Sequence, residues 1–344
     1  MKRLETVKDV TAYQADPNRK LYSANHDEIE AGLTTDVYFV KTKEILEKNG
    51  YADTIVTAEI FARRGGVVAG IEECLNLLAG LDVEVWALEE GSSFEPKEVI
   101  MRITGNYTEF GIYETAILGI LASSTGWATA AHEVAQVAED KPFFCFGARH
   151  VHPAIAPVME KAAIVGGAHG ASCILGAKLA GLEPVGTVPH ALFLIVGDTV
   201  DAAKMYDQLM PPESPRTILV DTFKDEVEES LRLGEAMGKR LEGIRLDTAS
   251  ERGGVTPDLV AEVRAKLDYA GYDHVKIFVS GGLTLERIKG LSAAGVDAFG
   301  VGSYISAAQP IDMTMDLKEV DGKPVAKRGR IPGLSKSERL KRMI

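Results

Sequence analysis

Residues 275–303 read VKIFVSGGLTLERIKGLSAAGVDAFGVGS and contain two short apolar runs separated by an amphipathic stretch. The first run ends in Ser280-Gly281-Gly282 and the second in Gly300-Val301-Gly302-Ser303. Thr284 is placed to cap the intervening stretch, which predicts a helix between two strands. Strands of a parallel sheet are covered on both faces and therefore read as continuous apolar runs. The pattern thus predicts a strand–helix–strand unit with parallel strands.

The same rhythm extends over the second half of the chain. Seven short apolar runs, each containing Gly, Asp or Ser, lie at residues 143–147, 170–174, 184–188, 217–223, 243–249, 275–282 and 297–303. Helical patterns separate most of them, and Thr256-Pro257 is a good helix start. We therefore predict an α/β fold with an irregular (β/α) barrel of about seven strands over residues 116–304. A doubly wound open sheet is the alternative.

Residues 1–115 differ in pattern and predict an N-terminal α+β sandwich domain. Strand-like runs at 55–61, 83–88 and 99–104 surround a helical pattern at 66–81, and turn-rich segments follow. Residues 305–344 return to short strand-like and loop segments. From Lys323 to Ile344 the chain carries eight Lys/Arg and one Glu, a local charge of +7. Such a run is usually a solvated surface, although contact with phosphate is the other interpretation.

Composition excludes several classes of function. The 344 residues include 38 Lys/Arg and 50 Asp/Glu, so the formal net charge is −12. An acidic protein is not drawn to nucleic acid or to anionic membranes. Three cysteines cannot form a disulfide framework or a four-thiolate zinc site, so we expect a cytoplasmic protein. The longest uncharged stretch, 115–131, is interrupted by polar residues and predicts a buried helix rather than a membrane span.

In a barrel, functional groups lie at the C-terminal ends of the strands. This rule selects Arg149, His150, His152, Thr187, His190, Asp221, Asp247 and the two glycine-rich ends. A strand that ends in glycines before a helix lets backbone N–H groups approach a phosphate, which makes Gly281, Gly282, Gly300, Gly302 and Ser303 candidates for phosphate binding. The alternative is that these glycines only form turns.

The polar candidates allow more than one interpretation. His190 can serve as a base, as a nucleophile toward a phosphoryl group or as a metal ligand, or it can be a hydrogen-bonded core histidine. Asp221 and Asp247 can hold ribose hydroxyls or Mg²⁺, or can cap helices. Arg149 suits a carboxylate or a phosphate, or a surface ion pair. The three histidines His150, His152 and His169 lack a carboxylate at ligand spacing, so no metal site is assigned.

The ordered set of motifs resembles the type II phosphoribosyltransferases, which include nicotinate, nicotinamide and quinolinate enzymes, and it is most similar to the nicotinate group. The motifs are TTDVYF (34–39), FARRGG (61–66), VEVWALEEGSSF (83–94), YETAILGILASSTGWATAA (113–131), FGARHVHP (146–153), GTVPH (186–190), VDTF (220–223), IRLDT (244–248), SGG (280–282), FGVGS (299–303) and KPVAKRG (323–329). The resemblance implies an N-terminal domain partly completed by the C-terminal segment, beside an irregular barrel. It also implies a homodimer with shared active sites, or a higher oligomer.

The resemblance also implies roles for individual residues. Tyr38, contributed across the dimer, and Phe146 would sandwich a pyridine ring, and Arg149 would pair with its carboxylate. The remaining substrate and catalytic contacts would be Thr187, His190, Asp221, Arg245 and Asp247, with His190 phosphorylated by ATP. The 5′-phosphate would lie on Gly281, Gly282, Gly300, Gly302 and Ser303, and the pyrophosphate on Arg63, Arg64, Lys327 and Arg328.

The implied activity is ATP-assisted transfer of a phosphoribosyl group from phosphoribosyl pyrophosphate to nicotinate, with Mg²⁺, in NAD salvage. Quinolinate or nicotinamide as substrate, and a catalytically silent nucleotide-binding relative, are the alternatives. The segment GIRLDTASERGG lacks the Asp-Ser-Gly-Asp run common in the family, which motivates the silent alternative. Pro189 precedes His190 where some relatives carry a carboxylate, and the tail has no cysteines for the zinc module of other relatives.

Overall fold

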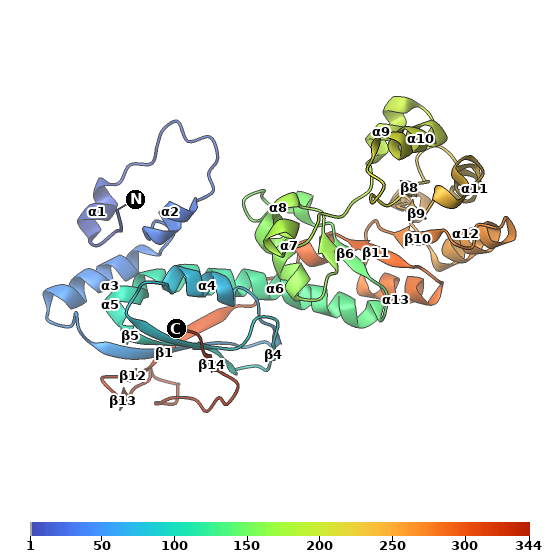
Figure 1. The fold of residues 1–344 in the computed structure, drawn as a ribbon. Coiled ribbons are helices and arrows are strands. Elements are labelled where there is room, and N and C mark those ends of the chain that lie inside the picture. The colour runs from blue at the N-terminus through green and yellow to red at the C-terminus, as the bar shows by residue number, and fades with distance from the viewer. Residues whose placement is uncertain (1) are drawn as a thin grey trace. The chain divides into compact units, whose positions relative to one another are not determined.

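The computed structural model describes residues 2–344, which divide into two compact units (Figure 1). The first unit contains the chain up to Thr129 together with Gln309–Ile344, and the second contains Ala130–Ala308. The division falls inside the long helix α6 (Glu114–Ala138), further along the chain than the expected boundary at residue 115. No helix among residues 2–344 is both long and apolar enough to cross a membrane.

The first unit is built on an antiparallel six-stranded sheet with the order β13-β12-β1-β5-β3-β14. Its strands are β1 (Ile55–Ala62), β3 (Val83–Ala87), β5 (Val99–Asn106), β12 (Met313–Val320), β13 (Lys323–Pro324) and β14 (Lys341–Arg342). A separate pair joins β2 (Gly66–Val67) to β4 (Ser93–Phe94). Segments from the C-terminal part of the chain therefore form both edges of this sheet.

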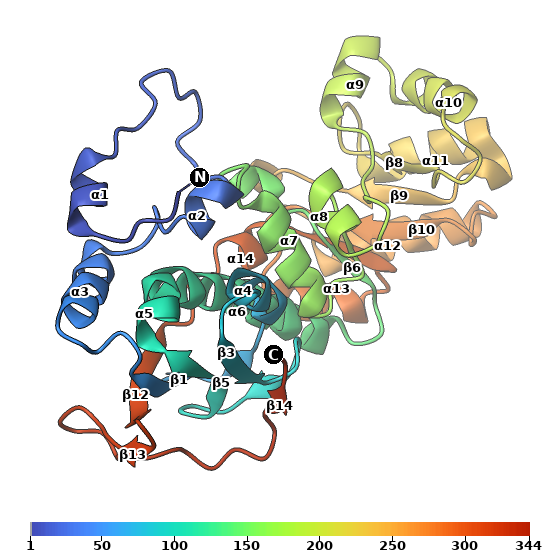
Figure 2. The same cartoon turned by 60° about the vertical axis from the view of Figure 1, so that its left-hand side comes forward.

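Helices cover one face of this sheet (Figure 2). They are α4 (Ile71–Leu78) and the first part of α6. The other helical elements of this unit are α1 (Val7–Ala12), α2 (His26–Glu30), α3 (Val37–Lys48), α5 (Tyr107–Phe110) and the 3₁₀ turn η1 (Gly111–Tyr113). Buried apolar residues of α4 and α6, such as Cys74 and Ile117, pack with Ile60 and Met101 of the sheet. The helix predicted from residue 66 begins only at Ile71, because residues 66–67 form β2 and Gly70 has a left-handed φ of 95°.

The second unit is an α/β unit with a six-stranded parallel sheet of order β7-β6-β11-β10-β9-β8. The strands are β6 (Phe143–Cys145), β7 (Gly170–Ala171), β8 (Thr217–Leu219), β9 (Gly243–Leu246), β10 (Lys276–Val279) and β11 (Ala298–Val301). The helical elements are η2 (Ala148–His150), α7 (Ala156–Val165), α8 (Ile174–Leu179), α9 (His190–Val196), α10 (Thr199–Leu209), α11 (Glu226–Met237), η3 (Gly238–Arg240), η4 (Ser250–Arg252), α12 (Pro257–Tyr269), α13 (Leu285–Ala293) and α14 (Ser303–Ser306). The predicted α/β class with parallel strands is confirmed.

The expected barrel of about seven strands needs correction. The strand order follows the chain around a ring, since β11 pairs with β6, but among residues 2–344 no ladder joins β7 to β8. The predicted strand at 184–188 is missing, although the Val185 amide donates a hydrogen bond to the Ala171 carbonyl at 2.9 Å. Pro184 and Pro189 bound this run, and a proline cannot donate to a ladder. Within residues 130–308 the sheet therefore has six parallel strands, with β7 and β8 at its two edges.

Candidate active site

The site forms where three neighbouring parallel strands end. Asp221 follows β8, Asp247 comes directly after β9, and Ser280 comes directly after β10. Because the carboxyl ends of parallel strands lie along the same edge of a sheet, residues far apart in the sequence meet there. His190 is the first residue of α9, on the connection that leads toward β8. The structure thus brings together the three residues predicted to be catalytic.

The imidazole of His190 lies between two carboxylates. Its Nε2 atom is 3.7 Å from Oδ2 of Asp221 and 3.6 Å from Oδ2 of Asp247. Its Nδ1 atom lies 3.0 Å from the hydroxyl of Thr222, so the second ring nitrogen is also fixed. The side chain is 37% exposed, so part of the imidazole is open to solvent. Such a ring is held in orientation on one side and available for chemistry on the other.

Asp221 is the most buried acid of the site. Its side chain is 5% exposed, and its Oδ1 atom is buried without a hydrogen-bond partner. Burial raises the pKa of Asp221 above its usual value, while the nearby His190 acts in the opposite direction. A buried carboxylate oxygen without a donor is costly, which is typical of a group that meets its partner in a bound ligand or cation.

Arg245 on β9 is fixed in a polar network. Its Nε donates to Ser280 Oγ at 2.8 Å, its Nη1 donates to Thr187 Oγ1 at 3.0 Å, and its Nη2 lies 3.6 Å from Oδ2 of Asp247. Ser280 in turn donates to Oδ1 of Asp247 at 2.7 Å. Burial lowers the pKa of Arg245 below its ordinary value, but an arginine remains charged in proteins. Arg245 thereby joins Thr187 and Asp247 in one polar cluster.

Aromatic rings form a wall beside Arg245. The ring centroids of Phe146 and Phe278 are 5.9 Å apart, and the Arg245 guanidinium carbon lies 5.3 Å from the Phe146 centroid. Gly300 of β11 lies beneath both rings, and a Cβ there would be 2.7 Å from Phe146 Cδ2 and 3.0 Å from Phe278 Cε1. Gly300 was predicted at the end of a strand, and it lies within β11, where it is buried. Its missing side chain makes room for the rings.

The other candidate glycines lie at strand ends as expected. Gly281 and Gly282 have left-handed φ values of 89° and 56°, and a Cβ on Gly281 would be 2.9 Å from Oδ1 of Asp247. The Arg287 side chain donates from Nη1 to both of their carbonyls, at 3.2 and 2.9 Å. Gly302 precedes Ser303, the first residue of α14. The backbone of the β10 loop is therefore held in a conformation that favours glycine.

Arg149 lies on the exposed turn η2 after β6. Its Nε donates to Nε2 of His150 at 3.4 Å, and Nδ1 of His150 lies 3.1 Å from the hydroxyl of Ser306. The histidines considered for a metal are not gathered, since His169 instead packs edge-on against Phe143 at 6.1 Å. Within residues 2–344 no group of three His, Cys, Asp or Glu side chains is arranged to hold a metal ion.

The other predicted contacts belong to the first unit. Tyr38 on α3 is 56% exposed and donates from its hydroxyl to Oδ2 of Asp36 at 3.2 Å. The basic residues Arg63, Arg64, Lys327 and Arg328 are all exposed. Lys327 pairs with Asp316 at 3.1 Å. Each of these residues therefore presents a polar group at the surface of its own unit.

Comparison with known proteins assigns the family. Residues 36–125 match the N-terminal domain of quinolinate phosphoribosyl transferase, and residues 127–316 match its C-terminal domain. The chain belongs to the quinolinate phosphoribosyl transferase family. The type II phosphoribosyltransferase resemblance drawn from the motifs is thereby confirmed at the level of the family.

The chain is similar to proteins that are named for two different activities. A nicotinate phosphoribosyltransferase of Mycobacterium tuberculosis is 32% identical over 263 residues, which cover 73% of this chain and 55% of that protein. The nicotinate phosphoribosyltransferase of Bacillus subtilis is 30% identical, covering 80% of this chain and 64% of that protein. This chain thus spans about half to two thirds of these relatives. The crystal structure of nicotinate-nucleotide pyrophosphorylase from Pyrococcus furiosus is 49% identical, with a TM-score of 0.88, and covers 92% of this chain and 82% of that chain.

Several residues that build this site were not predicted from the sequence. One is Thr222, whose hydroxyl contacts His190. The others are Phe278, whose ring lies beside Phe146, and Arg287, which donates to the carbonyls of the β10 loop. Thr222 could have been found, because it follows Asp221 in the VDTF motif. Phe278 lies in an apolar strand, and its role depends on Gly300 of the neighbouring strand. No signal in a single sequence reveals such a cross-strand contact.

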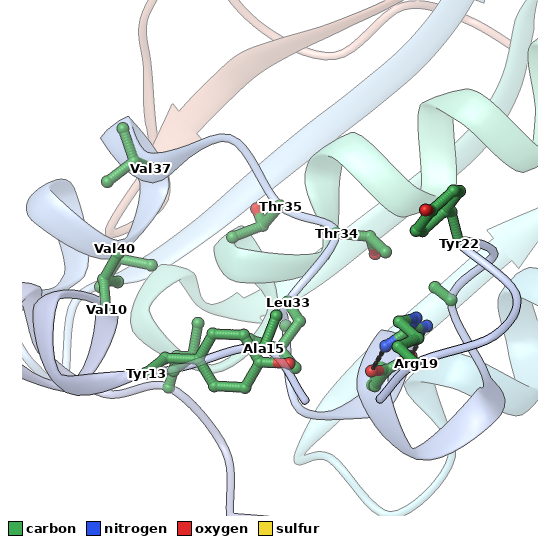
Figure 3. A pocket seen from close by; sticks show the side chains of 14 residues that line it. Val10, Tyr13, Ala15, Arg19, Tyr22, Leu33, Thr34, Thr35, Val37 and Val40 are labelled. Atoms are coloured by element: carbon green, nitrogen blue, oxygen red, sulfur yellow. Dashed lines mark hydrogen bonds and ion pairs between the residues drawn. The ribbon is translucent and has the colours of Figure 1, made fainter. Parts of the chain in front are cut away.

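A separate hollow lies in the first unit and contains none of the predicted site residues. It has a volume of about 450 Å³ and lies between α1, the following loop and the start of α3 (Figure 3). Val10, Tyr13 and Val40 give it an apolar lining. Arg19 at its rim is engaged, since its Nη2 donates to Glu28 at 2.7 Å and its Nε donates to the Leu21 carbonyl at 2.8 Å. The hollow therefore lacks a free charged group for substrate binding.

Proposed function

We propose that this chain transfers the phosphoribosyl group of phosphoribosyl pyrophosphate to nicotinate, forming nicotinate mononucleotide and pyrophosphate. The observation that carries the proposal is the position of His190, whose Nε2 lies within 4 Å of Asp221 and Asp247, at 3.7 and 3.6 Å. The relatives from Mycobacterium tuberculosis and Bacillus subtilis are named nicotinate phosphoribosyltransferases, which supports nicotinate as the substrate.

The residues suit a displacement at the anomeric carbon of the ribose. The pyridine nitrogen forms a bond to this carbon while the bond from the carbon to the pyrophosphate oxygen breaks, through a cationic, oxocarbenium-like state. The nitrogen carries no proton, so no general base is required. The carboxylates Asp221 and Asp247 would stabilise the cationic sugar. Phe146 would stack on the pyridine ring, and Arg149 would pair with its carboxylate.

His190 would couple the reaction to ATP. When Nδ1 carries the proton and donates to Thr222, Nε2 keeps a lone pair that can attack the terminal phosphorus of ATP. The bond from that phosphorus to the ADP oxygen breaks, and water later hydrolyses the phosphohistidine to restore the imidazole. The phosphoryl group adds negative charge and acceptor oxygens beside the substrate. This charge would change the affinity for the substrates.

The acids of the site fit Mg²⁺ bound together with substrate phosphates. Mg²⁺ usually uses one or two carboxylates plus phosphate oxygens, and Asp221 has a buried oxygen that lacks a partner. Asp221 and Asp247 are the residues that would hold it. When bound, the ion would neutralise charge on the departing pyrophosphate. The pyrophosphate would also meet Arg63, Arg64, Lys327 and Arg328, and the 5′-phosphate would meet Gly281, Gly282, Gly302 and Ser303.

A pyridine with two carboxylates is the second candidate substrate. The 49% identity to a nicotinate-nucleotide pyrophosphorylase favours quinolinate. The observed site favours one carboxylate, because Arg245 already serves Ser280, Thr187 and Asp247. Arg149 is exposed and is the guanidinium that we assign to the substrate.

We further propose a cytoplasmic homodimer in which Tyr38 reaches the pyridine ring of the partner's site. The large exposed fraction of the Tyr38 ring supports a role outside its own unit. Sedimentation of the purified protein measures the assembly. A monomeric enzyme with full activity would contradict the shared site.

The decisive experiment offers nicotinate, quinolinate and nicotinamide separately to the purified chain with phosphoribosyl pyrophosphate and Mg²⁺, with and without ATP. We expect pyrophosphate and nicotinate mononucleotide from nicotinate, with ATP increasing the yield. Turnover of quinolinate with release of carbon dioxide, and none with nicotinate, would establish the second candidate. Nucleotide binding without pyrophosphate release from any pyridine would indicate a silent relative and overturn both candidates.

A further inference from the structure

Glu160 on α7 is a fully buried carboxylate that belongs to none of the roles described above. Its exposed fraction is 0%. A carboxylate is rarely buried to this degree unless donors surround it, because removing its charge from water is costly. The donors that surround Glu160 therefore indicate what the residue does.

Three donors from two loops converge on this carboxylate. Oε1 accepts a hydrogen bond from the Ala148 amide at 3.2 Å and from the Ser172 hydroxyl at 3.1 Å. Oε2 accepts from the Cys173 amide at 2.6 Å. Ala148 follows β6 and Ser172 follows β7, so one side chain joins the ends of two neighbouring strands. Hydrogen bonds to an ionised acceptor are about twice as strong as neutral ones, which makes this junction rigid.

The first of these donors belongs to the turn that carries Arg149. Ala148 is the first residue of η2, and Arg149 is the second. The guanidinium is exposed, so its own contacts hold it weakly, and the backbone beneath it determines where it can point. The hydrogen bond from the Ala148 amide to Glu160 fixes the backbone of this turn.

We propose that Glu160 is a positioning residue that holds the Arg149 turn so that its guanidinium receives the carboxylate of the pyridine substrate. The inference rests on the proposed function, in which Arg149 pairs with nicotinate. Glu160 acts through the backbone and does not touch the substrate. Its loss should therefore weaken recognition of the carboxylate more than any other step.

The substitution Glu160→Gln keeps the shape of the side chain but replaces one acceptor oxygen with an NH₂ donor. That donor must then face an N–H or O–H group that previously donated, so at least one of the three bonds is lost. Glu229→Gln is a matched control, because Glu229 is also 0% exposed but pairs with Arg232 on α11. Both variants remove a buried negative charge from the same unit.

The experiment measures kcat, the KM values of nicotinate and phosphoribosyl pyrophosphate, and the inhibition constant of nicotinamide, a neutral analogue. We expect Glu160→Gln to raise the KM of nicotinate about tenfold, the scale of one charge-assisted hydrogen bond. The other constants, including that of nicotinamide, should change less than about twofold, as should every constant of the Glu229→Gln control. In an Arg149→Ala background, Glu160→Gln should add no further increase.

Other outcomes separate the two proposals. An unchanged nicotinate KM in Glu160→Gln, or equal losses for nicotinate and nicotinamide, would overturn the role of Glu160 alone. A wild-type chain that does not use nicotinate would overturn the proposed function and this inference with it. Glu160→Asp keeps the charge but shortens its reach, and it is expected to give the same selective increase in KM if the amide variant does not fold.

Discussion

The Nε2 atom of His190 lies 3.6 Å from an oxygen of Asp247, although His190 begins α9 and Asp247 follows β9, 57 residues further along the chain. The other oxygen of Asp247 accepts a hydrogen bond from Ser280, so the carboxylate is held between the histidine and the β10 loop. A reactive imidazole and a fixed acid are thereby presented at one edge of a parallel sheet.

His190→Ala should abolish hydrolysis of ATP and retain a slower, ATP-independent transfer. The variant removes the nucleophilic nitrogen but leaves the acids and the glycine loops in place. ADP release and nucleotide formation are measured in parallel, with His274→Ala as the control, because His274 is exposed and contacts no predicted residue. ATP consumption by the His190→Ala variant at the wild-type rate would show that the phosphohistidine assignment is wrong.

Asp221→Asn should lower activity and increase stability. The pKa of Asp221 is raised by burial, so its ionised form destabilises the folded protein at neutral pH. Because the folded pKa exceeds the unfolded one, the wild-type stability falls as pH rises through that interval, whereas the asparagine lacks this dependence. We expect kcat to fall about 100-fold or more and the free energy of unfolding at pH 7 to rise.

Chemical denaturation at several pH values measures the change in stability, and initial rates measure the change in activity. Asp258→Asn, in the exposed first turn of α12, is a control that should alter neither quantity strongly. A less stable Asp221→Asn variant would indicate that the carboxylate has a partner in the folded protein. Full activity of the variant would remove Asp221 from the mechanism.

Gly300→Ala should damage the aromatic wall. The new Cβ would lie 2.7 Å from Phe146 Cδ2, so the ring must move or the strand must shift. Overpacking of this kind costs about 1 to 3 kcal/mol, and displacement of Phe146 should raise the KM of nicotinate. Gly119→Ala is the matched control, because no atom lies within 4 Å of its Cβ position and alanine favours the helix there. Equal melting temperatures for the two variants would contradict the packing argument.

Glu114 should make the stability of the first unit depend on pH near neutrality. Burial, with the charge of Asp316, raises the pKa of Glu114 to about 7. An acid with a raised folded pKa contributes stability at low pH, and this contribution is lost as pH rises from its ordinary value of 4.5 through about 7. After allowance for solvent screening, the change is roughly 1 to 2 kcal/mol.

Unfolding by urea at pH 5.5 and pH 8 measures this contribution. The difference between the wild type and Glu114→Gln should favour the wild type more at pH 5.5 than at pH 8. Glu95→Gln, on an exposed turn, should leave the pH dependence of the wild type intact. A difference that does not vary with pH would show that Glu114 does not titrate in this range.

Part of the site could be predicted because several candidates follow the end of an apolar run. Asp221, Asp247 and Ser280 were placed by this rule alone, and the parallel sheet brings the three strand ends together. The rule works because parallel pairing places the carboxyl ends of all strands at the same edge of the sheet. It failed for residues 184–188, where two prolines prevent a ladder despite the apolar composition.

The sequence by itself determined the class of the fold, the strand ends and the chemical types available there, because apolar periodicity and turn residues are local properties. Only the tertiary structure decided that His190 meets two acids, that Gly300 makes room for Phe146 and Phe278, and that Glu160 joins two loops. These relationships depend on which strands become neighbours and on the space between their side chains. A linear pattern carries no information about either until the chain has folded.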